Sequence, residues 1–181
     1  AYSAPNVGSV TPLSNNATIC SYPRFCEKNA LPADADLVRL NHLSASANAG
    51  QTVDIPTGVG FCMYIRRDCL TQTGLFDVEH FGKGYGEEND FCMRAHDLGW
   101  RHLLALDTFV LHTGGVSFGE SKTPREHAAY QTLLQLHPEY DALVQAHLQA
   151  NPAQAARNAI DKARLRHHPL PRVLMVLHNA G

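Results

Sequence analysis

The residues best suited to chemistry lie in one run, Gly84–Asp90, which reads Gly-Tyr-Gly-Glu-Glu-Asn-Asp. It joins a glycine-rich loop to a predicted helix over 87–98, so Glu87 and Glu88 fall in the first helical turn. A helix N-terminus carries partial positive charge, which keeps carboxylates ionised. Such a glutamate, with a reference pKa of about 4.3, can accept a proton from a hydroxyl within hydrogen-bond reach. The run therefore predicts a general base.

A structural role for the same carboxylates stays open at this point. Acidic residues are common in first helical turns, where they only complement the helix dipole. Asp90 and Arg94 stand four residues apart, the spacing of an ordinary ion pair along a helix. On local physics alone, the structural interpretation is favoured.

The elements around this run alternate between strands and helices, which predicts an α/β fold. Strands are expected over 7–11 and 61–65, and over 101–105 and 108–111 on either side of a turn at 106–107. Helices are expected over 33–44, 68–72 and 87–98. Two more fall within 124–150 and are separated at Pro138, followed by a helical linker over 151–171. A final strand is expected over 172–177.

Composition excludes several classes of function. The chain has 181 residues and a formal net charge of −2, so nothing favours binding to nucleic acid or an anionic membrane. Its five cysteines show no Cys-x-x-Cys spacing, which favours a reducing compartment. No apolar run reaches the roughly 18 residues of a membrane span. We therefore expect a cytoplasmic protein, at most peripheral to the inner membrane face, whose oligomeric state the sequence leaves open.

Four motifs, in order, extend the Gly84–Asp90 run. They are Thr57-Gly58-Val59-Gly60-Phe61-Cys62-Met63-Tyr64-Ile65-Arg66-Arg67, Gly74-Leu75-Phe76-Asp77, the run continued through Arg94, and Leu98-Gly99-Trp100 followed by a strand ending at His112. This series resembles the second half of bacterial family 2 glycosyltransferases. The resemblance implies a partial GT-A fold, the acceptor-side half of the nucleotide-diphospho-sugar transferase fold, with added C-terminal helices.

The resemblance also implies roles for individual residues. Glu88 matches the family's catalytic aspartate and would deprotonate the acceptor hydroxyl, although the sequence has Glu-Glu where Glu-Asp is usual. Glu87 would orient the site or bind acceptor. His112 would help to hold a divalent metal, Mg²⁺ or Mn²⁺. The acceptor-binding residues implied are Gly58, Tyr85, Gly86 and Asp90.

The family's Asp-x-Asp motif, which holds the metal and the nucleotide diphosphate, has no match in the expected place. Asp34-Ala35-Asp36 has the letters but stands at a predicted helix start, where we interpret it as a cap. We expect the true motif, and most of the metal site, upstream of Ala1. The 181-residue chain alone is then expected to bind a nucleotide-sugar poorly and to be inactive.

Three segments follow from these observations. Residues 1–120 are predicted to form the acceptor-side half of a GT-A domain, and 121–171 to form C-terminal helices and a linker. Residues 172–181 resemble the opening strand of a GT-B-type glycosyltransferase domain, with a last edge strand of the same domain as the alternative.

The function implied by the resemblance is inverting transfer of a sugar from a nucleotide-sugar to an acceptor hydroxyl of a glycan, in surface polysaccharide biosynthesis. A non-catalytic carbohydrate-binding or assembly module is the alternative. A zinc hydrolase using His96, His102 and His112 is a third hypothesis, which no His-x-x-x-His spacing supports.

Overall fold

A computed structural model describes residues 4–31, 35–82, 85–113 and 122–166 of the chain. The strands of this part are β1 (Val7–Ser14), β2 (Thr52–Ile55), β3 (Tyr64–Ile65) and β4 (Arg101–Val110). The helices are α1 (Leu37–Ala47), α2 (Arg67–Thr73), α3 (Val78–Phe81), α4 (Glu87–Asp97), α5 (Lys122–Leu136), α6 (Tyr140–Ala150) and α7 (Gln154–Arg166), with one 3₁₀ turn, η1 (Thr18–Cys20). The predicted strand over 172–177 lies outside the described residues.

The four strands form one mixed sheet in the order β2-β4-β1-β3. The central strands β1 and β4 are parallel, while β3 runs antiparallel to β1 and β2 antiparallel to β4. The two central strands are far apart in the sequence, and the helices between them provide the crossover that a parallel pair requires. The α/β class is therefore confirmed, in the form of a mixed sheet with helices around it.

Two strand predictions need correction. The segment 101–111 is one strand without a turn, because Asp107 is accommodated at an irregularity: Pro12 pairs with Ala105, and Leu13 then pairs with Phe109. The Asp107 carboxylate accepts the Gly50 N–H at 3.0 Å there. In the segment 61–65 only the two residues of β3 are strand, and both are at least partly exposed.

Helix boundaries agree better with the sequence. Asp36 caps α1, since its side chain accepts the Arg39 N–H at 2.8 Å. Helix α4 begins at Glu87, as expected from the glycine before it. Helices α5 and α6 are separated around Pro138, and α7 lies within the predicted helical linker.

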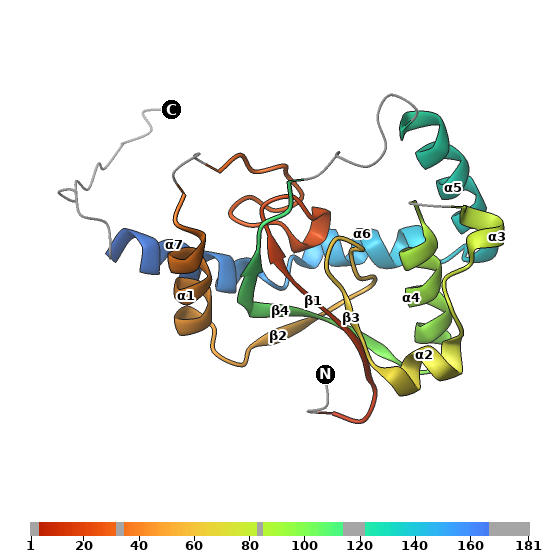
Figure 1. The fold of residues 1–181 in the computed structure, drawn as a ribbon, viewed down its shortest axis with the longest axis horizontal. Coiled ribbons are helices and arrows are strands. Elements are labelled where there is room, and N and C mark those ends of the chain that lie inside the picture. Colours follow the sequence, from red (N-terminus) through yellow and green to blue (C-terminus); the bar gives the residue numbers. More distant parts are fainter. Residues whose placement is uncertain (1–3, 32–34, 83–84, 114–121, 167–181) are drawn as a thin grey trace, which may run out of the picture.

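The helices form two groups around the sheet (Figure 1). Helices α1 and α7 pack together, with α1 against β4, while α2 to α5 gather at the other side and α6 lies between the groups. The largest buried cluster includes Leu13, Leu40, Leu104 and Ile160. Another cluster joins Phe91 and Cys92 of α4 to Trp100, so the inner face of α4 is anchored. Within the described residues, no helix is both long and apolar enough to span a membrane.

Candidate functional site

A pocket of about 340 Å³ lies at the N-terminal end of α4. Its walls come from η1, the loop 57–59, the first turn of α4 and one side of α6. Glu88 and Asn89 line it from α4, and Tyr140 lines it from α6. The predicted base therefore faces a cavity large enough for a small ligand.

Gly86 sets the direction in which α4 leaves the preceding loop. Its φ of +88° lies in the left-handed region, which glycine adopts without steric cost. A Cβ at this position would stand only 2.8 Å from Cδ1 of Phe81. Gly86 thus has a structural requirement for glycine that is independent of any ligand.

The Glu88 carboxyl is partly buried at the pocket wall, and no cation among the described residues pairs with it. Burial raises the pKa of Glu88 above its usual range, and the nearby Glu87 carboxylate raises it further. Backbone amides, including that of Gly60, donate hydrogen bonds that offset part of this rise. Within the described part of the chain, the result is a desolvated carboxylate without a counter-ion, which is a stronger base than a surface glutamate.

Glu87 is also partly buried, and its Oε2 is buried without a hydrogen-bond partner among the described residues. A buried carboxylate oxygen ordinarily accepts a hydrogen bond, because burying it without one costs free energy. The negative charge of Glu87 also contributes to the raised pKa of Glu88.

Thr57 and Gly58 hold the loop that faces Glu88. The Thr57 hydroxyl lies 2.8 Å from Asn89 Oδ1, which ties the loop to α4. The Gly58 N–H donates to Cys92 Sγ at 3.2 Å. A Cβ on Gly58 would stand 2.3 Å from Met63 Sδ, so a larger residue here would require the Met63 side chain to move. Gly58 lines this pocket, and its contact with an acceptor stays a prediction.

Asp90 does not lie in this pocket. Its side chain is 2% exposed, Oδ2 accepts from Arg94 at 2.8 Å, and Oδ1 lies 2.9 Å from His137 Nε2. Arg94 also donates to the carbonyl oxygens of Thr73 and Leu75. Both carboxylate oxygens are therefore occupied by protein groups, and the expected acceptor contact of Asp90 is replaced by a structural one.

Tyr85 and Gly86 also lie apart from the Glu88 pocket. Tyr85 packs against the cluster of Phe81, Ala129 and Leu133, and lines a second cavity of about 480 Å³ between α3 and α5. Gly86 contributes a backbone turn beside Phe81. Tyr85 and Gly86 thus line no part of the Glu88 pocket, and Tyr85 lies beside α3 and α5 instead.

His112 lines a third cavity, of about 320 Å³, with Asn15 and Leu111. Its Nδ1 lies 2.5 Å from the carbonyl oxygen of Asn16, which assigns a proton to Nδ1. Its ring stacks on Phe61 at 5.1 Å. Across the described ranges, no group of three His, Cys, Asp or Glu side chains is placed to hold a metal ion. These residues do not form a metal site by themselves, and we derive no chemical step through a metal.

The zinc arrangement of three histidines also fails on geometry. His102 is buried, with Nδ1 2.7 Å from Ser9 Oγ and Nε2 3.0 Å from the Cys92 carbonyl. Burial lowers the pKa of His102 to about 4, so it is neutral and both ring nitrogens are engaged. His96 is exposed on α4. His102 therefore has a structural role.

Sequence reasoning missed the contribution of α6. Tyr140, Val144 and Leu148 line the pocket from one face of this helix, at spacings of four residues. That periodicity was visible, but it indicates only a helix face that packs on something. The surface that α6 faces is formed by residues about 50 to 130 positions earlier in the chain, which the local pattern does not reveal.

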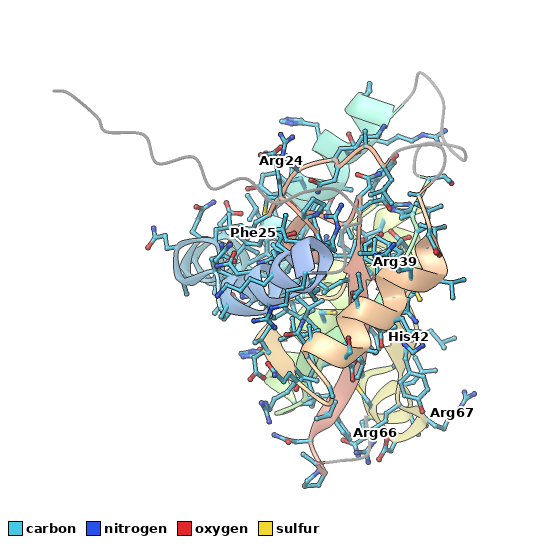
Figure 2. All side chains as sticks on the ribbon, turned by 90° about the vertical axis from the view of Figure 1, so that its left-hand side faces the viewer. Arg24, Phe25, Arg39, His42, Arg66 and Arg67 are labelled. Carbon is cyan, nitrogen blue, oxygen red and sulfur yellow. The ribbon has the colours of Figure 1, made fainter. Side chains whose placement is uncertain are left out.

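The η1 wall of the pocket is fixed by a buried arginine, Arg157 of α7. Its Nε donates to the Ser21 carbonyl at 2.8 Å, and its Nη2 donates to the Ile19 carbonyl at 2.9 Å. The guanidinium also stacks 4.5 Å from the centre of the Phe25 ring, and Figure 2 shows Phe25 beside α7. The C-terminal helices α6 and α7 therefore both shape the pocket.

Comparison of the chain with protein-family models, with curated protein sequences and with solved structures found no match.

Proposed function

We propose that this chain is the acceptor-side part of an inverting glycosyltransferase and that Glu88 is its general base. The observation that carries the proposal is the Glu88 carboxylate, which has a raised pKa, faces a pocket of about 340 Å³ and pairs with no cation among the described residues. Perturbed carboxylates in clefts are typical of functional sites. The four ordered motifs around Glu88 select sugar transfer among the reactions that need such a base.

In the proposed reaction, Glu88 accepts the proton of the acceptor hydroxyl. The hydroxyl oxygen attacks the anomeric carbon of the donor sugar as the bond from that carbon to the diphosphate oxygen breaks. The diphosphate leaves with the electron pair on the opposite face, so the configuration is inverted. The first turn of α4 and the loop 57–59 hold the base and its neighbours in place, which is the orientation that such a step requires.

Donor binding is assigned by the resemblance to an upstream segment that this sequence does not contain. A divalent metal, Mg²⁺ or Mn²⁺, would be held mainly there and would stabilise charge on the leaving diphosphate. His112 is the described residue that the resemblance implies as a ligand. Synthesis of a surface polysaccharide on the cytoplasmic side of a membrane is part of the same proposal.

The test is the substitution Glu88→Gln in the full-length protein, assayed by release of nucleoside diphosphate from a panel of nucleotide-sugars. Loss of a general base is expected to lower kcat by roughly 10²- to 10⁴-fold, with little change in the KM for acceptor. Asp97→Asn, in the last turn of the same helix and exposed, is the matched control and is expected to keep full activity.

Full turnover in the Glu88→Gln enzyme would contradict the proposal. If that enzyme also bound glycan as well as the parent protein does, the result would favour the non-catalytic carbohydrate-binding module.

A further inference from the structure

The pocket around Glu88 has a polar end and an apolar wall. Glu88, Asn89 and Thr57 gather at one end. Val144 and Leu148 of α6 face the cavity together with Ile19 of η1, and these three side chains can offer no hydrogen bond. A ligand that fills this space must therefore meet both kinds of surface.

Tyr140 joins the two parts. Its ring belongs to the same face of α6 as Val144 and Leu148, and its hydroxyl lies within electrostatic range of Glu88. Burial first, and then the Glu88 carboxylate, raise the pKa of Tyr140, so the phenol keeps its proton. Among the described residues the hydroxyl has no hydrogen-bond partner, which leaves a donor available beside the proposed base.

We propose that α6 is the acceptor-recognition face of this site, and that it selects a sugar acceptor with an apolar surface next to its nucleophilic hydroxyl. The Tyr140 hydroxyl binds an oxygen of the acceptor sugar, while Val144 and Leu148 contact its apolar part. This inference depends on the proposed function for the identity of the ligand as an acceptor.

The chemistry of the wall explains the selection. A fully hydroxylated sugar face laid on Val144 and Leu148 loses hydrogen bonds to water and receives none in return. A methyl group or an aglycone ring in the same place removes apolar surface from water. The apolar surface can come from the sugar itself, as in a 6-deoxyhexose, or from an apolar group attached to it. Both sources of apolar surface have the same chemistry, and binding of 6-deoxy and of phenyl glycosides distinguishes between them.

The experiment measures binding of simple glycosides to the 181-residue chain by NMR chemical-shift titration. The ligands are methyl hexosides in the gluco, galacto and manno configurations, their methyl 6-deoxyhexoside counterparts, and the corresponding phenyl hexosides. For at least one configuration we expect the 6-deoxy or the phenyl glycoside to bind about 10-fold more tightly than the methyl hexoside. The ligand with the larger gain identifies the source of the apolar surface.

Two variants link the preference to α6. Val144→Thr keeps the side-chain shape and adds a hydroxyl, so it is expected to reduce the 10-fold preference to less than about 3-fold. The matched control, Val38→Thr on α1, changes a side chain that is 78% exposed and remote from the pocket, and is expected to keep the preference. Tyr140→Phe is expected to weaken all the glycosides by a similar factor, about 5- to 10-fold, and to leave the preference intact.

Equal binding of the three glycoside types, binding that shifts no α6 resonance, or an unchanged preference in Val144→Thr would each overturn the inference. Absence of any binding would do the same. This binding test is independent of the test of the base. If Glu88→Gln keeps full turnover while the Val144-dependent binding preference persists, acceptor recognition by α6 is supported and the catalytic role of Glu88 is contradicted.

Discussion

Glu88 and Asp90 stand two residues apart in the first turn of α4, but they face different surroundings. Asp90 is buried, and its two oxygens are occupied by Arg94 of α4 itself and by His137, the residue that follows α5. Glu88 faces the pocket, where burial raises its pKa and no cation compensates its charge among the described residues. One turn of helix thus carries a carboxylate that stabilises the fold beside a carboxylate that is left available.

The contrast shows why the run of acidic residues supports two interpretations at once. A buried carboxylate with charged hydrogen-bond partners has a complete structural explanation. A desolvated carboxylate without such partners costs folding free energy and needs another explanation, which is most often chemistry. The structural interpretation therefore holds for Asp90, while the catalytic interpretation of Glu88 is a proposal.

The largest effect on stability is expected for Asp90→Ala. This change leaves Arg94 and His137 without their shared acceptor, and breaking a buried charged network in this way costs about 3–5 kcal/mol of unfolding free energy. Asp97→Ala, at an exposed position of the same helix, is the control and is expected to change it by less than about 0.5 kcal/mol. Denaturant unfolding of both variants measures the difference. Equal losses of unfolding free energy in the two variants would mean that the contacts of Asp90 with Arg94 and His137 do not stabilise the fold.

An intermediate loss of stability is expected for Gly86→Ala, because Gly86 is the residue immediately before α4 and positions the start of this helix. A left-handed φ in a non-glycine residue costs about 1–3 kcal/mol. The contact with Phe81 adds about 1–3 kcal/mol of overpacking. Gly99→Ala separates the two costs, because Gly99 has a φ of +86° and no atom within 4 Å of an added Cβ.

Thermal or denaturant unfolding of the two glycine variants measures this contrast. If Gly86→Ala is no more destabilising than Gly99→Ala, the packing against Phe81 does not define the start of α4.

The smallest effect, and the one of opposite sign, is expected for the stability of Glu88→Gln. Because the pKa of Glu88 is raised in the folded state, the folded chain binds more protons than the unfolded chain just above pH 4.5. The unfolding free energy of the wild type therefore falls, relative to that of the variant, as pH rises through this interval. We expect Glu88→Gln to be at least as stable as the wild type at pH 7, with the gain absent below pH 4.

Unfolding curves at pH 4, 5.5 and 7 check the sign of this effect. Glu79→Gln changes an exposed glutamate in the first turn of α3 and serves as the control, for which no pH-dependent gain is expected. Marked destabilisation of Glu88→Gln at pH 7 would assign Glu88 a structural role like that of Asp90.

Local signals were sufficient for much of the fold. The glycine before Glu87, the cap at Asp36 and the break at Pro138 act within a few residues of the elements they limit, so their consequences could be predicted. The turn expected at 106–107 was wrong, because pairing with β1 continues the strand through an irregularity that local composition does not reveal.

The candidate site was harder to predict, because its contacts are long-range. Asp90 was assigned to the acceptor, since nothing near it in the sequence shows that His137 is its partner. No pattern in the sequence distinguishes Tyr140, and its position beside Glu88 follows only from the placement of α6. Motif order identified Glu88, whereas the residues that surround it came from the fold.

The most direct test of the central claim is the titration of the Glu88 carboxyl carbon by NMR in the 181-residue chain. The midpoint is expected above the ordinary value of 4.5, because burial and Glu87 both favour the protonated form. Replacing Glu87 with glutamine is expected to lower that midpoint, since it removes the neighbouring negative charge. A midpoint at or below 4.5 would contradict the account, because it would show a carboxylate that is solvated or paired and hence no different from a structural one.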